Sequence, residues 1–160
     1  MEAARQALAS GKHVLIEKPS VLRLQELDEL EARIEALLTA HCPDLLGLFG
    51  VGPDTAAALI VCAGDNPERV RSEPAWARLC GVAPIPTGSG KTSGRVRLHR
   101  GGDRQANSAL WRIVMVRIAH HPETTAYYHR KLHEGRAKKD VIRLLKRYVA
   151  REIYRYLPRG

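Results

Sequence analysis

Long apolar runs and cysteine pairs are both missing from this 160-residue sequence. No stretch of about 18 apolar residues exists, so no membrane-spanning helix is predicted. The opening residues MEAARQALASGKH lack the basic segment and apolar segment of a secretory signal. We therefore expect a cytoplasmic protein without a membrane partner.

Cysteine is scarce and unpatterned. Cys42, Cys62 and Cys80 are odd in number and show neither CxxC nor Cys/His spacing, which argues against a zinc site and against a disulfide framework. We expect three buried thiols and no metal site. The adjacent His120 and His121 fall at the end of an expected helix, where capping is a commoner role than metal ligation.

Acidic residues are scarce in the second half of the chain. Residues 1–85 hold 8 Lys and Arg against 12 Asp and Glu, whereas residues 86–160 hold 18 against 5. The second half therefore carries most of the positive charge behind the formal net +9. Such a surplus favours a polyanionic partner, and nucleic acid is the usual one, although a solvated basic surface would give the same composition.

The hydrophobic spacing predicts a mostly α-helical domain with a Gly/Pro-rich loop at 82–102 that holds at most a short hairpin at 96–98. The expected helices include one at 22–40 with Leu27, Leu30, Ile34 and Leu37 on one side, one within 67–80, and one at 104–120 with Ala106, Ala109, Leu110 and Ile113 on its apolar face. We divide the chain into residues 1–21 of uncertain origin, a helical segment at 22–42, and a main domain at 43–160. The segment 22–42 fits either a coiled coil or a helix packed on the domain.

Residues 45–65 read LLGLFGVGPDTAAALIVCAGD. Two short apolar helices joined by a glycine turn form the pattern of a helix-hairpin-helix. Gly50 and Gly52 permit positive φ values in such a turn, and its backbone N–H groups can hold a phosphate without reading base sequence. An ordinary tight helical turn remains the alternative.

The last expected helix is long and basic. One side carries Lys139, Arg143, Arg147, Arg151 and Arg155, one at every fourth residue, and the other carries Ile142, Leu145, Val149, Ile153 and Tyr156. Like charges at this spacing repel one another, so the stripe is better explained by bound phosphates than by helix stability. A solvated face with snorkelling arginines is the alternative.

Residues 86–92, PTGSGKT, resemble a nucleotide-binding phosphate loop only superficially. Such a loop needs a buried strand before it and a helix directly after it. The preceding WARLCGVAPIP predicts no strand, the following SGRVRLHRGG cannot begin a helix, and Ile85 stands where the first glycine should be. We reject the nucleotide-binding interpretation.

Five blocks of the sequence point elsewhere: GVGP at 50–53, CGVAPIP at 80–86, SGK at 89–91, RGGDRQAN at 100–107 and LKRYVARE at 145–152. In this order they resemble the C-terminal domain of insertion-sequence transposases of the IS-110 type, over about residues 22–157. The resemblance implies a DNA recombinase in which this domain supplies a serine nucleophile. A separate resolvase-like domain supplies a DEDD cluster that binds Mg²⁺, and a structured RNA acts as guide.

The resemblance assigns the nucleophile to Ser89, although Gly88 stands where the family often has another serine. Cations expected to contact DNA nearby are Lys91, Arg95, Arg97, Arg100 and Arg104. Glu26, Asp28, Glu29, Glu31 and Glu35 follow one another along one expected helix and indicate a solvated face, so Mg²⁺ is not expected in this chain.

No DEDD domain is recognisable in the sequence. We therefore expect a truncated or fused element that binds DNA, forms a homo-oligomer and needs a DEDD domain from elsewhere for chemistry. A non-catalytic helix-hairpin-helix module that binds DNA or RNA is the alternative. A tyrosine recombinase acting through Tyr127 or Tyr128 is disfavoured, since no Arg-His-Arg arrangement accompanies them and edge-packed tyrosines are commoner.

Overall fold

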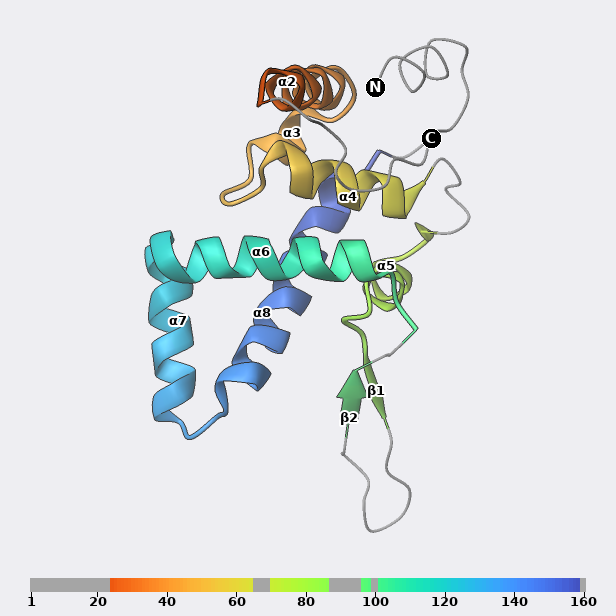
Figure 1. Cartoon of the computed structure of the whole chain (residues 1–160). Coiled ribbons are helices and arrows are strands. Elements are labelled where there is room, and N and C mark those ends of the chain that lie inside the picture. Colours follow the sequence, from red (N-terminus) through yellow and green to blue (C-terminus); the bar gives the residue numbers. More distant parts are fainter. Residues whose placement is uncertain (1–23, 65–69, 87–95, 99–100, 159–160) are drawn as a thin grey trace.

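The computed structural model describes residues 24–64, 70–86, 96–98 and 101–158 and is mostly helical, as the sequence predicts (Figure 1). Its elements are α2 (Leu24–His41), α3 (Pro43–Leu46), α4 (Pro53–Ala63), α5 (Glu73–Leu79), β1 (Pro84–Pro86), β2 (Val96–Leu98), α6 (Arg104–His120), α7 (Pro122–His133), α8 (Lys138–Ile153) and the 3₁₀ turn η3 (Tyr154–Tyr156). Over these ranges the structure contains no helix with the length and apolar character to cross a membrane.

Helix α6 is the centre of the fold and packs against α4, α7 and α8 (Figure 1). Its expected apolar face is confirmed, because Ala106, Ala109, Leu110 and Ile113 are fully buried. Helix α8 buries Leu145, Val149 and Ile153 as predicted. Tyr156 is an exception: it lies in η3 after the helix has ended and is exposed.

The helix boundaries follow from local capping. Ser72 accepts a hydrogen bond from the N–H of Ala75 at the start of α5, and Asp103 accepts one from Ala106 at the start of α6. His121 lies between α6 and α7, and its side chain accepts from the N–H of Thr124, so it caps the start of α7, whereas the sequence indicates capping at the end of α6. Gly135 follows α7 with φ of 82°, the left-handed conformation in which glycine commonly ends a helix.

Helix α2 packs on α3 and α4 through one side only. Leu38 is buried and Ile34 partly buried, whereas Leu27 and Leu37 remain exposed. The predicted helix is present, but Leu38 takes the core position that the sequence pattern assigns to Leu37. Helix α2 is thus packed on the domain, which is one of the two interpretations that the sequence leaves open for this segment.

The two strands form a small antiparallel ribbon in which Pro84 pairs with Leu98, Ile85 with Arg97, and Pro86 with Val96. It extends from α5 away from the helices (Figure 1). Strand β1 corrects the expectation that no strand precedes PTGSGKT: two prolines do not prevent pairing in a ribbon whose two strands are both edges. The next described element is a returning antiparallel strand, not the helix that a phosphate loop requires.

All three cysteines are free and buried, as predicted. Burial raises the pKa of the Cys42 thiol. A hydrogen bond with Cys62 and burial together raise the pKa of Cys80. These thiols belong to the core, where Cys80 lies among the fully buried side chains with Trp76 and Val82.

Candidate nucleic-acid interface

Both ends of the β1–β2 ribbon are fixed where Gly102 meets Gly81. A β-carbon placed on Gly102 would lie 2.2 Å from the nitrogen and 2.3 Å from the Cα of Gly81, so only glycine fits there. Gly81 itself has a φ of 66°. The N–H of Asp103 donates to the carbonyl of Leu79 at 2.7 Å, which joins the chain leaving the ribbon to the end of α5.

Asn107 fastens the same junction from α6. Its amide donates to the carbonyl oxygens of Cys80 at 2.8 Å and Gly81 at 3.3 Å. The ammonium of Lys146 on α8 donates to Asn107 Oδ1 at 2.8 Å. The blocks CGVAPIP, RGGDRQAN and LKRYVARE, far apart in the sequence, therefore meet in one hydrogen-bonded cluster at the base of the β1–β2 ribbon.

Lys146 is nearly buried, and burial together with the positive charge of Arg143 lowers its pKa. A buried ammonium is costly unless it is hydrogen-bonded, and Asn107 supplies an acceptor. The side chain of Lys146 therefore has a structural partner inside the fold.

Arg147 forms a two-point ion pair with Glu73 on α5. The second contact joins Nη2 to Oε2 at 2.8 Å, and both side chains are about four-fifths buried. A bidentate pair of this kind fixes the angle between two helices. Arg147 thus connects α8 to α5, and its guanidinium is not free to bind phosphate in the way that the stripe pattern predicts.

A groove of about 690 Å³ lies next to this ion pair. Its walls come from α5, from the start of β1 and from α8, and include Arg78, Leu79, Ile85 and Arg147. Arg78 is exposed and places a solvated cation at the base of the ribbon.

The turn between α3 and α4 holds the GVGP block. Gly50 adopts φ of 78° and lies against α6, where a β-carbon would meet the carbonyl oxygen of Ile113 and a methyl carbon of Val116, each at 3.4 Å. Gly52 has a φ of −99°, so the positive φ expected for both glycines is wrong for Gly52. Its role is that of an N-cap, because its N–H donates to the hydroxyl of Thr55 at 3.0 Å.

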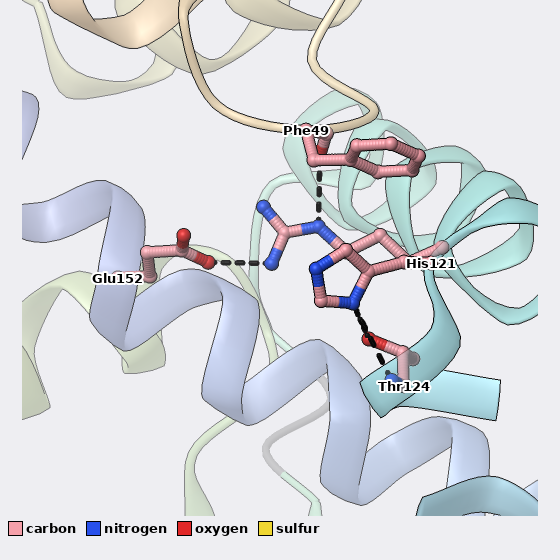
Figure 2. A network of polar contacts seen from close by, with 5 residues as sticks. Phe49, His121, Thr124 and Glu152 are labelled. Carbon is pink, nitrogen blue, oxygen red and sulfur yellow. Dashed lines mark hydrogen bonds and ion pairs between the residues drawn. The ribbon is translucent and has the colours of Figure 1, made fainter. Parts of the chain in front are cut away.

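Arg117 holds this turn in place from α6 through contacts with Phe49 and Glu152, both labelled in Figure 2. Its Nε donates to the carbonyl of Phe49 at 2.8 Å and its Nη1 to Glu152 on α8 at 2.6 Å. The residue is only 9% exposed. The ring of Phe49 lies 5.0 Å from the ring of His121, so the turn also packs on the junction between α6 and α7.

The cations of the α8 stripe have different environments. Lys139 and Arg155 are exposed, Arg143 pairs with the half-exposed Asp140 at 2.8 Å, and Arg151 lies 6.0 Å from the ring of Tyr148. Four of the five positions therefore remain on the surface. Arg147 alone among them is withdrawn into a partly buried ion pair.

Of the remaining predicted site residues, Arg97 and Arg104 belong to described elements. Arg104 begins α6 and is exposed, and Arg97 is the middle residue of β2. Ser89, Lys91, Arg95 and Arg100 lie outside the described residues, as does the side chain of Arg97. In chain order, Ser89 belongs to the nine-residue connection between Pro86 and Val96.

The tyrosines considered as alternative nucleophiles are packed residues. Tyr127 meets Tyr148 edge to face with ring centroids 5.9 Å apart, and Tyr128 meets His129 in a similar way. Burial and a hydrogen bond with Tyr148 raise the pKa of Tyr127, which makes its hydroxyl a poorer nucleophile. The edge-packed role expected for these residues is present.

Sequence reasoning missed Arg117, Asn107, Lys146 and Glu73 as parts of the framework. Their partners lie far away in the sequence and are reached where helices cross. Arg117 and Glu152 are 35 residues apart, and Lys146 and Asn107 are 39 residues apart. Only the position of Arg117 and Lys146 beside apolar helix faces could have indicated burial. Within the described residues, no group of three or more His, Cys, Asp or Glu side chains could hold a metal ion.

Comparison with known proteins identifies the family. Residues 42–129 match the profile described as "Transposase IS116/IS110/IS902 family", which is more than half of the chain. The chain is also similar to an uncharacterized 43.6 kDa protein of insertion element IS110 from Streptomyces coelicolor, at 37% identity over 67% of this chain and 27% of that protein. A second relative is an uncharacterized 42 kDa protein of insertion element IS900 from Mycobacterium paratuberculosis, at 28% identity over 76% of this chain and 31% of that protein.

The matched segments thus span about a third or less of these two relatives. The profile covers the GVGP, CGVAPIP, SGK and RGGDRQAN blocks and ends within α7, so α8 with its LKRYVARE block lies beyond it. The four blocks inside the match include the turn held by Arg117 and the base of the ribbon. The chain belongs to the IS116/IS110/IS902 family of transposases.

Proposed function

We propose that this chain is a DNA-recombining transposase domain that supplies Ser89 as the nucleophile. The observation that supports it best is the convergence of three motif blocks on the base of the ribbon, through Gly81, Gly102, Asn107 and Lys146. A nucleophile is effective only when its scaffold is rigid to within a fraction of an ångström. The ribbon anchored by this cluster is suited to carry a connection containing Gly-Ser-Gly-Lys.

In the proposed reaction, the hydroxyl oxygen of Ser89 attacks the phosphorus of a DNA phosphodiester. A new serine–phosphate ester bond forms while one deoxyribose oxygen leaves and takes a proton. The serine proton passes to a base, and the reverse reaction with another strand end rejoins the DNA. Because one phosphate ester replaces another, the step needs no oxidant and no nucleotide.

The transition state of this exchange carries extra negative charge that must be stabilised. Lys91, Arg95, Arg97, Arg100 and Arg104 are the cations of this chain nearest to Ser89 in sequence or at the end of the ribbon. We assign the base and Mg²⁺ to a DEDD domain supplied in cis or in trans, where the metal would stabilise charge on the phosphate. The described residues offer no ligand cluster for Mg²⁺, so no part of the metal chemistry is assigned to them.

DNA contacts are assigned to two surfaces of the second half of the chain. One is the ribbon with Arg104 at the start of α6, and the other comprises Lys139, Arg143 and Arg151 on α8. Both lie in the half that carries 18 basic residues against 5 acidic ones. Arg147 is left out because Glu73 already neutralises it.

The alternative function is a helix-hairpin-helix module that binds nucleic acid without chemistry. The turn at Gly50 and the start of α4 would then contact the phosphate backbone. Asp54 lies in the first turn of α4 and pairs with Arg112 at 3.7 Å, so this helix start already has a carboxylate. That negative charge makes the turn a weaker phosphate site, and membership in a transposase family favours the catalytic proposal.

The decisive experiment looks for a covalent adduct. The full chain is mixed with Mg²⁺, a phosphate-labelled DNA carrying the ends of a related insertion element, the structured RNA of that element, and a separately expressed DEDD domain from a family member. We expect a labelled protein band that withstands denaturation and is lost in Ser89→Ala. The matched control is Ser108→Ala, at an exposed position on α6, which should keep the band.

Three outcomes of this experiment differ in meaning. A band lost only in Ser89→Ala supports the nucleophile. DNA binding without any adduct, in the presence of an active DEDD domain, supports the non-catalytic module. An adduct that persists in Ser89→Ala but disappears in Tyr127→Phe or Tyr128→Phe would show that a tyrosine is the nucleophile.

A further inference from the structure

A cluster of aromatic and basic side chains lies where α7 and α8 pack together, apart from the ribbon. Tyr127 and Tyr148 meet edge to face with centroids 5.9 Å apart. Arg130 lies 5.3 Å from the centroid of Tyr127, and Arg151 lies 6.0 Å from that of Tyr148. We name these four residues the aromatic–basic face.

The four residues differ in what they offer to a ligand. Tyr127 is half-buried and packs against the core, whereas Tyr148 is 48% exposed although it is a large aromatic residue. Arg130 and Arg151 are exposed. Tyr127 therefore packs edge to face against the ring of Tyr148, and Tyr148 presents an aromatic surface to solvent with the guanidinium group of Arg151 beside it.

The two arginines of this face stand outside the ion pairs that the described residues of the surrounding helices form. Among the described residues, neither Arg130 nor Arg151 has a carboxylate within ion-pair distance, in contrast to Arg143 with Asp140 and Arg147 with Glu73. The nearby Lys131 is paired with Glu134 at 2.6 Å. From α7 to η3, ten lysine and arginine residues stand against four carboxylates. The face thus combines an exposed ring with two arginines, each beside a tyrosine ring, in a positive surrounding.

This combination selects one kind of ligand. Phosphates of duplex DNA need cations and backbone N–H groups, and exposed aromatic rings add nothing because the bases are stacked inside the helix. Unpaired nucleotides expose their bases, which stack on tyrosine rings and arginine planes while the phosphates meet the same arginines. An exposed tyrosine beside one arginine, packed on a second tyrosine that has its own arginine, fits the second case.

We propose that the aromatic–basic face binds unpaired nucleotides of a DNA strand, with a base stacked on Tyr148 and phosphates on Arg130 and Arg151. The proposal rests on the proposed function, since strand cutting and rejoining exposes unpaired DNA. It adds a site for that strand on α7 and α8, separate from the serine. DNA is preferred over RNA because DNA is the substrate of the proposed reaction.

Photo-crosslinking tests the proposal directly on the full chain. A single-stranded oligodeoxynucleotide with 5-iododeoxyuridine at each position in turn is irradiated with the protein, and the crosslinked peptide is identified by mass spectrometry. We expect a crosslink at Tyr148. Affinity for the strand should fall about 5-fold to 100-fold in Tyr148→Leu, the range expected for one lost stacking contact. Tyr148→Phe keeps the ring and should bind almost as the wild type does.

The matched control is Tyr156→Leu, which removes an exposed tyrosine from η3 outside the face. This variant should keep strand affinity, and circular dichroism of all variants should remain that of the wild type. Arg151→Ala should weaken strand binding and reduce its salt dependence, because it removes a phosphate contact.

The other results overturn the proposal. Equal loss of affinity in Tyr148→Leu and Tyr156→Leu, or the absence of a Tyr148 crosslink while the strand is bound, would remove the stacking site. A crosslink that forms with the matching RNA but not with DNA would assign the face to RNA. Duplex binding and the Ser89 adduct, measured on the Tyr148 and Tyr156 variants, separate these results from a failure of the proposed function: both persist if only the face has been misassigned.

Discussion

Gly102 lies against Gly81 so closely that a methyl group on the first would overlap the backbone of the second, at 2.2 Å from its nitrogen. This contact joins the two ends of the β1–β2 ribbon to the end of α5. Among the described glycines, Gly102 leaves the least room for a β-carbon, and it lies at the base of the β1–β2 ribbon. The proposed nucleophile Ser89 belongs, in chain order, to the connection between these two strands.

Gly102→Ala should therefore destabilise the fold. The new methyl group forces backbone atoms apart, and overpacking of this kind costs about 1–3 kcal/mol or more. Urea unfolding followed by circular dichroism measures the change. Gly47→Ala is the control, because Gly47 has φ of −71° and a β-carbon there meets only the carbonyl oxygen of Asp44, at 3.4 Å. Equal stability of the two variants would contradict the contact.

Replacing Arg117 by Met should loosen the GVGP turn. The substitution keeps most of the aliphatic stem but removes the donors to Phe49 and Glu152, which we expect to cost about 2–4 kcal/mol. Hydrogen exchange of the amides at 50–52 should accelerate more than that of β2. Arg112→Met removes an exposed pair with Asp54 and should change stability by about 0.5 kcal/mol or less. A stable Arg117→Met variant with unchanged exchange would show that the turn does not depend on Arg117.

The pair of Arg147 and Glu73 should behave as a structural ion pair. A double-mutant cycle with Arg147→Met and Glu73→Gln is expected to give a coupling energy of about 1–3 kcal/mol, because the contact is bidentate and mostly shielded from water. The same cycle on Arg143 and Asp140, which are half exposed, should give about 0.3–0.5 kcal/mol. Similar energies for the two pairs would mean that Arg147 remains available as a surface cation.

DNA affinity should depend steeply on salt. If the ribbon and the α8 cations contact about 6–8 phosphates, the logarithm of the binding constant should fall with the logarithm of salt concentration with a slope of about −5 to −7. Lys139→Ala, Arg143→Ala and Arg151→Ala should each weaken all duplex sequences alike and flatten the slope by about 1. Glu26→Gln on α2 serves as the control with unchanged slope. A flat salt response of the wild-type chain would remove the argument from charge.

The thiols should react slowly with a disulfide reagent such as DTNB while the protein is folded. All three are buried, and the pKa values of Cys42 and Cys80 are raised, so less thiolate is present at pH 8 than in a free cysteine. Between pH 9 and pH 10 the reaction rate of an ordinary thiol levels off because the thiol is already ionised. The reaction rate of Cys42 and Cys80 should still rise over this range. Urea should release all three at once. Fast reaction of Cys42 or Cys80 at neutral pH would contradict their burial.

The sequence by itself determined the helices, because a helix depends on neighbours three and four residues apart. The spacing of Ala106, Ala109 and Leu110 predicted the buried face of α6, and Asp103 and Ser72 began their helices as short capping side chains do. The five motif blocks likewise identified the family without any coordinates, since four of them fall within the matched residues.

Only the tertiary structure decided which polar residues hold the fold together. Arg147 belongs to the same four-residue repeat as Arg151, yet one pairs with Glu73 across 74 residues and the other lies beside Tyr148 on the surface. Asn107, Lys146 and Arg117 found their partners through helix crossings in the same way. The periodicity of one helix shows which residues share a face. Whether a charge on that face is buried depends on the element that packs against it, and this element comes from a distant part of the chain.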